Sequence, residues 1–275
     1  MSTPQAEIEP LCPALGAVLH NIDLSRTLPE EQVDVVQQAL LEHQVVFFRD
    51  QSLGPEDLSR LANQFGSPTV YPFVEGLDDH PDVIEVLKLP DEKHNFGGVW
   101  HADTTYLPEP AMGAILYADI IPKTGGDTLF SNMCLAYESL STAMQEMLSK
   151  LRAVNDADKP AIANTRYHRL GANKPKNLKA THPVVRTHPE TGRKLLFVSR
   201  AHTTHFEGWS AAESRSLLTY LFDVQNRAEF TFRWQWQPGS VAFWDNRACQ
   251  HYPLNDYHGQ KRRMLRISLK GDRPF

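Results

Sequence analysis

The sequence predicts a mainly β protein with flanking helices, arranged as a β-sandwich or a double-stranded barrel. Strand patterns concentrate in the later part of the chain, where the alternating aromatic residues of EFTFRWQW have the period of a half-buried strand. Helix patterns concentrate in the first half, and no regular β-α-β alternation is found. Helices that support one β architecture explain this order better than a doubly wound sheet does.

The early elements are two strands and two helices. GAVLHNIDL has the character of a short strand, and VVFF (45–48) that of a buried strand. Between them, Pro29–His43 is expected to be a helix, because it has a proline at the start, acids in the first turn and an apolar stripe. The second helix is expected to begin near Pro55 and to end before Gly66.

The middle of the chain is less regular. The segment Leu140–Leu151 has the composition of a third helix. Residues 152–181 are polar and aperiodic. This composition predicts a long loop, or a lid that covers an active site. Ser210 and Glu213 form a capping box ahead of an apolar run, which predicts a fourth helix. After EFTFRWQW, the Pro238-Gly239 turn separates the strand patterns SVAFWD and RMLRISLKG.

Composition limits the classes of protein that the chain can represent. Its 275 residues, 41% of them hydrophobic, suffice for one large core, and no linker or internal repeat divides them. The net charge of −5 gives no basic face for nucleic acid, and neither a secretory signal nor a membrane span is recognised. The odd number of cysteines, three, favours reduced thiols and a cytoplasmic location.

Two separated motifs could supply a metal site. If HAD lies on a strand, His101 and Asp103 project from the same face, and His251 in DNRACQHY offers a third ligand. Two imidazoles and one carboxylate form the facial triad of non-haem Fe(II) oxygenases. His-x-Asp also occurs by chance, and a buried histidine is commonly hydrogen-bonded rather than metal-bound. Cys249 is an alternative ligand, although a buried cysteine usually acts as a small hydrophobe.

An anionic cosubstrate would require a cation, and QKRRMLR provides candidates. Arg262 and Arg266 share one face of a regular strand, about 13 Å apart along it. Bidentate carboxylate binding is the usual reason to bury arginine, and the alternative is that one or both face solvent. Thr128 of GGDT could add a hydroxyl, although the motif is also consistent with a simple turn.

The motifs WHADTTY, TGGDTLF, WDNRACQHY and QKRRMLR, in this order, resemble the taurine/2-oxoglutarate dioxygenase (TauD/TfdA) family. The similarity extends along most of the chain, including VVFFRDQSL and THPVVRTHPETGRKLLFVS. The resemblance implies a double-stranded β-helix (jelly roll) that forms a single domain over 1–275. It also implies catalysis with Fe(II), the cosubstrate 2-oxoglutarate and O2.

The resemblance assigns roles residue by residue. It implies that His101, Asp103 and His251 bind the iron, and that Arg262, assisted by Thr128, holds the distal carboxylate of 2-oxoglutarate. Arg266 matches the arginine that contacts the substrate sulfonate in taurine-oxidising members. Because related halogenases lack the carboxylate that Asp103 provides, the resemblance makes halogenation unlikely.

The substrate region departs from the taurine-oxidising members. Pro68 replaces a histidine, Gly97 replaces an asparagine, and His202 lies near the position of a pocket phenylalanine, while Tyr71 is kept. These differences argue against taurine, whereas Arg266 still favours an anion. A second pocket phenylalanine of those members aligns near Ala157. Candidates to exclude water are these aromatic residues, each of which could instead belong to the core: Phe73, Trp100, Tyr106 and Phe206.

The function expected from these observations is hydroxylation of a small organic anion, a sulfonate, sulfate ester or carboxylate. Oxidation at a carbon that bears a heteroatom would release sulfite, sulfate or a phenol. Two alternatives remain: a redox-inert metal-dependent isomerase or hydrolase on the same barrel, and a non-catalytic binding protein. Many members of the family are dimers or tetramers, so a homo-oligomer without nucleic-acid or membrane partners is expected.

Overall fold

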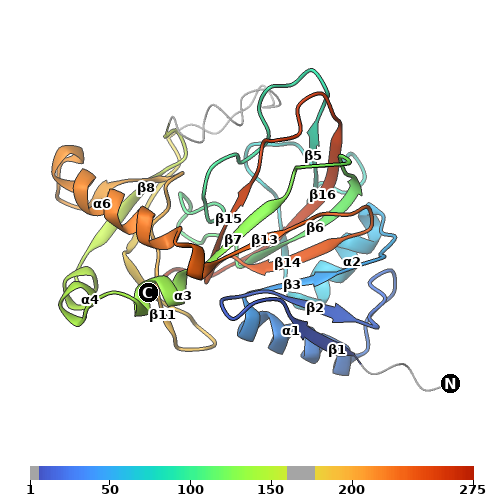
Figure 1. Ribbon diagram of the computed structural model, residues 1–275, viewed down its shortest axis with the longest axis horizontal. Coiled ribbons are helices and arrows are strands. Elements are labelled where there is room, and N and C mark those ends of the chain that lie inside the picture. Colours follow the sequence, from blue (N-terminus) through green and yellow to red (C-terminus); the bar gives the residue numbers. More distant parts are fainter. Residues whose placement is uncertain (1–5, 160–176) are drawn as a thin grey trace.

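A large β-sheet lies at the centre of the protein, with the helices of the first 65 residues on one side and the smaller sheets together with the later helices on the other (Figure 1). This computed structural model describes residues 6–159 and 177–275. Within these ranges the prediction of a mainly β protein with flanking helices is confirmed.

The large sheet has eight strands, in the order β1-β2-β3-β14-β6-β16-β4, with β5 also paired to β16. Its strands are β1 (Glu7–Pro10), β2 (Ala17–His20), β3 (Val45–Phe48), β4 (Pro68–Thr69), β5 (Val83–Lys88), β6 (Gly113–Ile120), β14 (Val241–Asp245) and β16 (Arg262–Leu269). The strand β16 pairs antiparallel with β6 and β5 over most of its length, so its side chains have fixed directions.

Three smaller sheets complete the β structure of the described residues. They are β13-β7-β15, β12-β8-β9 and β10-β11. Their bounds are β7 (Thr128–Asn132), β8 (Arg152–Asp156), β9 (Lys179–Pro183), β10 (Val185–Thr187), β11 (Lys194–Leu196), β12 (Thr203–Phe206), β13 (Thr231–Trp234) and β15 (Cys249–Pro253).

The helices follow the local sequence signals closely. They are α1 (Glu30–His43), α2 (Pro55–Phe65), α3 (Met133–Glu138), α4 (Thr142–Leu148), α6 (Ala211–Gln225) and the short 3-10 helix η2 (Ala228–Phe230). The predicted start of α2 at Pro55 and its end before Gly66 are confirmed. The capping box of Ser210 and Glu213 at the start of α6 is also confirmed.

Strand β3 shows why the central sheet is apolar on both faces. Val46 and Phe48 pack in the cluster that includes residues of α1 and α2. Val45 and Phe47 pack in a second cluster with residues of β7, β13 and β15. Because alternate side chains enter opposite layers, a continuous apolar run is expected for this strand.

Four predictions about elements were wrong in part. Of the strand expected for EFTFRWQW, only Thr231–Trp234 form β13, and Phe230 belongs to η2. The helix expected over Leu140–Leu151 covers only Thr142–Leu148, because Ser141 caps its start, and a separate helix, α3, precedes it. The loop expected over 152–181 begins and ends in strands β8 and β9, and its central residues 160–176 lie outside the described ranges. The strand expected for HAD is absent, since only His101 makes a β-bridge.

Among the helices of residues 6–159 and 177–275, none combines the length and the apolar character that crossing a bilayer requires.

Candidate metal centre and adjoining pockets

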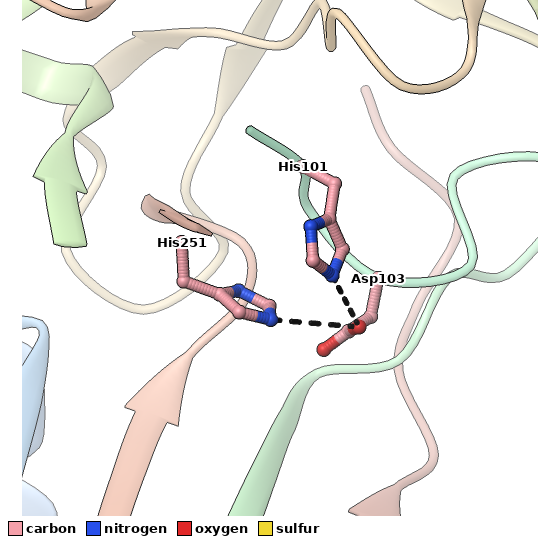
Figure 2. Close-up of side chains that lie close together, drawn as sticks. All are labelled: His101, Asp103 and His251. Atoms are coloured by element: carbon pink, nitrogen blue, oxygen red, sulfur yellow. Dashed lines mark ion pairs between the residues drawn. The ribbon is translucent and has the colours of Figure 1, made fainter. Parts of the chain in front are cut away.

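His101, Asp103 and His251 lie together in the interior. One ligand atom from each lies within 4.8 Å of the others, and all three residues are buried. The Nε2 atoms of His101 and His251 lie 3.7 and 3.9 Å from Oδ1 of Asp103. Figure 2 shows the two imidazoles directed toward this carboxylate oxygen from two separate segments of the chain. In the described part of the chain, no other cluster of such residues has the geometry of a metal site.

The two imidazoles meet because their backbones are paired. His101 N–H donates to the carbonyl of His251 over 3.0 Å, and His251 N–H donates to the carbonyl of His101 over 2.9 Å. Residues that face each other in such an antiparallel bridge point to the same side. The ring centroids consequently lie 4.1 Å apart, although the residues are far apart in the sequence.

Asp103 reaches the site by a turn rather than by strand alternation. The turn begins at Asp103, and Thr104 has a left-handed φ of 50°. The expectation that His101 and Asp103 share the face of one strand is therefore wrong in its geometry. The two side chains converge because the chain turns back immediately after the bridge.

Hydrogen bonds and burial prepare the imidazoles for a metal. The ring nitrogen Nδ1 of His101 lies 2.7 Å from the carbonyl of Val99, so it carries the proton and leaves the Nε2 lone pair available. Burial, together with the neighbouring His101, holds the pKa of His251 well below its usual range, so this ring is neutral. A neutral imidazole is the form that binds a metal.

The carboxylate of Asp103 is kept ionised. Burial alone would raise its pKa, but the positive charge of Arg266 holds the pKa well below its ordinary value. Two imidazole nitrogens and one carboxylate oxygen, with no thiolate, suit the facial triad of non-haem Fe(II). Cys249 does not belong to the cluster of ligand atoms, and its Sγ lies 3.8 Å from the carbonyl oxygen of Gln44.

Arg262 stands in a pocket beside the two histidines. The pocket is lined by both imidazoles, Thr128, Arg262 and Arg266 together with Val86, Phe96, Leu116, Phe130, Trp244 and Pro253. Arg262 is only 4% exposed, and its Nε and Nη2 have no hydrogen-bond partner. Burial lowers the pKa of its guanidinium, partly offset by Tyr257. Unpaired guanidinium donors in a closed pocket favour a carboxylate as their partner.

The residues around Arg262 set its position. Its Cζ lies 5.9 Å from the ring centroids of both Trp236 and Tyr257. Trp236 donates a hydrogen bond from Nε1 to the hydroxyl of Thr128 over 2.9 Å. The structure thus brings Thr128 and Arg262 to one pocket, as expected. The contributions of Trp236 and Tyr257 were missed, since an aromatic residue gives no sequence signal of such a role.

Arg266 lies closer to the metal ligands. Its Nη2 is 2.7 Å from Oδ2 of Asp103, a close ionic contact that is not aligned as a regular hydrogen bond. The guanidinium is 4% exposed, and its Nε has no hydrogen-bond partner. The alternative that Arg262 or Arg266 faces solvent is therefore wrong. The direct contact between Arg266 and Asp103 was not expected.

A second, smaller pocket lies on another side of the histidine–carboxylate cluster. It is lined by Tyr71, Phe96, Gly97, His101, Asp103, Thr104 and His202. The structure thus brings together Tyr71, Gly97 and His202, three of the residues expected near the substrate. Gly97 has a φ of 73°, and a Cβ there would lie 2.9 Å from Cε1 of His101. Because Gly97 has no side chain, the imidazole of His101 can occupy this position.

The remaining aromatic candidates divide into two groups. Phe73 packs edge-on against Tyr71 and Tyr106, with ring centroids 6.0 and 5.5 Å apart, in a cluster that also contains Ala157. Phe206 instead belongs to a core cluster with residues of α6. Of the two alternatives for Phe206, shielding the site or belonging to the core, the second is therefore confirmed. Trp100 packs against Tyr252, outside both pockets.

Comparison with known proteins gives consistent matches. Residues 7–268 match a family whose description is "Taurine catabolism dioxygenase TauD, TfdA family". An alkylsulfatase of Acinetobacter baylyi is 37% identical over 98% of this chain and 86% of its own length. An alpha-ketoglutarate-dependent sulfate ester dioxygenase of Pseudomonas putida is 33% identical over 98% of this chain and 91% of its own length.

Solved structures agree with these matches. A taurine dioxygenase from Burkholderia xenovorans is 36% identical, with a TM-score of 0.84 over 98% of this chain and 91% of that protein. A structure of AAD-2 with Mn(II) and N-oxalylglycine is 25% identical, with a TM-score of 0.82 over 98% of this chain and 99% of that protein.

Proposed function

The chain belongs to the TauD, TfdA family and is a non-haem Fe(II)- and 2-oxoglutarate-dependent dioxygenase, and on this premise we propose that it oxidises organic sulfate esters. The support from relatives is the 37% identity to an alkylsulfatase and the 33% identity to a sulfate ester dioxygenase, each over 98% of this chain. The dioxygenase assignment replaces the two alternatives, a redox-inert metal enzyme and a non-catalytic binding protein.

We propose that His101, Asp103 and His251 bind Fe(II) and that Arg262 binds the distal carboxylate of 2-oxoglutarate. The support is the buried cluster of three ligand atoms and the unpaired donors of Arg262 in the adjoining pocket. The hydroxyl of Thr128 lines the same pocket and assists. Bound Fe(II) with the 2-oxo acid supplies the activation of dioxygen for hydroxylation.

The observation that carries the proposed substrate class is the buried guanidinium of Arg266. It contacts Asp103 through Nη2, while its Nε has no hydrogen-bond partner. A buried arginine with an unpaired donor beside the reacting centre is suited to an anionic head group such as a sulfate. In this proposal Arg266 fixes the head group, and so places the adjacent carbon toward the metal centre.

The aromatic residues near the second pocket suit the organic part of the substrate. Tyr71 lines this pocket, and Phe73 and Tyr106 pack behind it. In this proposal Tyr71, Gly97 and His202 border the substrate, and Phe73 supports Tyr71. An apolar wall of this kind buries an alkyl or aryl group and excludes water from the reacting carbon.

The proposed reaction is a hydroxylation that leads to release of sulfate. One atom of O2 is inserted into the C–H bond of the carbon that bears the ester oxygen, and the other enters the succinate formed with CO2 from 2-oxoglutarate. The hydroxylated carbon then carries two oxygens, and its bond to the sulfate oxygen breaks. The products are an aldehyde and hydrogen sulfate, and the hydroxyl proton goes to the departing sulfate.

We also propose a double-stranded β-helix that forms a single domain over 1–275. The 98% coverage by solved relatives supports this. A cytoplasmic homo-oligomer, dimer or tetramer, is proposed as well. The free state of all three cysteines is consistent with the location, and light scattering of the purified protein would measure the assembly.

The substrate class is tested by measuring succinate and released sulfate over a panel of alkyl sulfates, alkanesulfonates, aryloxy acids and neutral alcohols. We expect alkyl sulfates to give equal amounts of succinate and sulfate. Best turnover with neutral compounds would contradict the role of Arg266. Best turnover of sulfonates or aryloxy acids would keep that role and replace the sulfate ester as the substrate.

The roles of Arg262 and Arg266 are distinguished by replacing each arginine with methionine. Arg262→Met should weaken 2-oxoglutarate binding at least about 30-fold, because truncating a buried charge pair costs several kcal/mol. Binding is followed by the visible band of anaerobic Fe(II) enzyme with 2-oxoglutarate. Arg266→Met should raise the KM of the anionic substrate by a similar factor.

Arg263 on the same strand provides the matched control, because it forms half-exposed ion pairs with Glu85 and Asp119. Arg263→Met should leave both the 2-oxoglutarate affinity and the substrate KM close to wild type. If Arg262→Met binds 2-oxoglutarate as well as Arg263→Met does, the assigned cosubstrate site is wrong.

A further inference from the structure

Asp103 lacks a strand partner, yet both of its backbone polar groups are bonded. Its N–H donates to Oδ1 of Asn246 over 2.7 Å, and its carbonyl accepts from Nδ2 of Asn246 over 3.1 Å. The same Nδ2 donates to the carbonyl of Ala111 over 2.9 Å, two residues before β6 begins at Gly113. One carboxamide therefore bonds both Asp103, where the turn begins, and Ala111, just before the chain enters the large sheet.

The carboxamide is chemically matched to this task. Asparagine carries a donor pair and an acceptor in one plane, as a peptide group does. Its side chain thus replaces the hydrogen bonds that a neighbouring strand would have made to Asp103.

Asn246 is itself held rigidly. Its residue is 1% exposed, and its backbone N–H donates to the carbonyl of Met112 over 2.8 Å. The preceding residue, Asp245, accepts hydrogen bonds from His188 over 3.0 Å and from Arg247 over 2.7 and 2.9 Å. A side chain on such an anchored backbone can define the position of another segment.

The segment 245–251 therefore determines all three ligand positions. It contains His251, it pairs through His251 with the backbone of His101, and it holds the backbone of Asp103 through Asn246. Arg266, by contrast, contacts the side-chain carboxylate of Asp103 rather than its backbone.

We propose that Asn246 is a positioning residue that sets the place of the Asp103 carboxylate in the metal site. This inference rests on the proposed assignment of His101, Asp103 and His251 as the metal ligands. It adds that the affinity for the metal depends on a carboxamide that touches neither the metal nor the substrate.

The test measures binding of Mn(II) or Co(II) to metal-free protein, so that no turnover is needed. Asn246→Ala should raise the Kd for the metal about 10-fold or more, the range found when groups that orient metal ligands are removed. Asn246→Asp has the same shape and keeps the acceptor for the Asp103 N–H. It loses the donor, so it should also weaken binding, and it serves if the alanine variant does not fold.

Asn132 provides the matched control. It is a buried asparagine that also makes several hydrogen bonds, since it accepts from the N–H groups of Cys134 and Leu135 and donates to the carbonyl of Ala14. Asn132→Ala should lower the Tm as Asn246→Ala does, but should keep the wild-type Kd for the metal.

The outcomes separate the inference from the function on which it rests. If wild-type protein binds no metal, or binds it equally well after Asp103→Ala, the proposed metal site fails. If wild-type protein binds the metal through Asp103 and both Asn246 variants bind equally well, only the positioning role fails. The positioning role also fails if Asn132→Ala and Asn246→Ala lose metal affinity to the same extent for the same fall in Tm.

Discussion

At the scale of single residues, the motifs predict which side chains meet but not how they are held. His101, Asp103 and His251 follow from the motifs and the resemblance, and the structure brings them within reach of one ion. The reasoning from strand alternation was nevertheless wrong, because Asp103 lies in a turn. A spacing of two residues is compatible with both geometries, so spacing cannot distinguish them.

The contacts of Arg266 and Asn246 show a second limit of sequence reasoning. Arg266 contacts Asp103, and Asn246 bonds the backbone of the same residue, from positions far along the chain. No local periodicity or spacing in the sequence predicts either contact. Both depend on the register of β14 and β16 in the large sheet.

Gly97 leads to a prediction at this scale. Gly97→Ala places a Cβ 2.9 Å from Cε1 of His101 at a φ of 73°, whereas Gly208→Ala places one in open space at a φ of 79°. Both variants should lose about 1 kcal/mol of stability through the left-handed backbone. Only Gly97→Ala should also weaken Mn(II) binding, by about 10-fold, because it displaces a ligand ring.

Chemical denaturation and metal titration of the two variants check this expectation. Equal metal affinity in the Gly97 and Gly208 variants would show that His101 can move aside without loss. The comparison is informative because the two substitutions share the backbone strain and differ only in the neighbour.

At the scale of elements, local signals predicted helices better than strands. Helices α1, α2 and α6 have apolar stripes and termini that are visible in the sequence. Strand β8 was missed because its inward side chains are Ala153 and Asn155, which give no apolar alternation. Asn155 accepts a hydrogen bond from the hydroxyl of Thr203 on β12, so the strand is stabilised by a distant polar partner.

The capping box of α6 gives a prediction for an element. The Ser210 hydroxyl accepts from the N–H of Glu213 over 3.2 Å, and the Glu213 carboxylate accepts from the N–H of Ser210 over 2.7 Å. Ser210→Ala should reduce the free energy of unfolding by about 1 kcal/mol, because a helix N–H loses its partner. Ser216 is exposed within the same helix.

The control for this change is Ser216→Ala, which should be neutral or slightly stabilising because alanine is the better helix former. Urea denaturation of both variants decides the matter. A Ser210→Ala variant as stable as Ser216→Ala would mean that the cap contributes nothing to this helix.

At the scale of the whole molecule, the mainly β architecture follows from the order of strand and helix patterns, but the pairing does not. The large sheet places β3 beside β14 and β6 beside β16. Val45 and Trp244, for example, are paired in the sheet although most of the chain lies between them in the sequence. Local patterns carry no information on such partners, whereas the resemblance to a family does.

His182 gives a prediction for the stability of the whole fold. Burial is the main cause that lowers the pKa of His182 from 6.5 to about 4, against the hydrogen bonds to the carbonyls of Thr105 and Leu107. The folded protein therefore binds this proton less readily than the unfolded chain does. The contribution of neutral His182 to the stability of the fold is therefore complete above pH 6.5, and it is lost as the pH falls toward 4.

The loss over this range should reach about 3 kcal/mol. His182→Gln retains a donor for the two carbonyls and should flatten the dependence of the unfolding free energy on pH between 6.5 and 4. His258→Gln changes an exposed histidine and should leave the slope as it is. Identical slopes in wild type and His182→Gln would refute the expected linkage.

The enclosed thiols carry a consequence for an enzyme that handles oxygen. Cys249 lies two residues before His251 in β15, and burial raises the pKa of both Cys249 and Cys134. Sulfur is attacked by oxidants and alkylating agents mainly as the thiolate. The thiols of Cys134 and Cys249 should therefore react slowly in the folded protein, and rapid labelling of these two cysteines by iodoacetamide would report the opening of the fold.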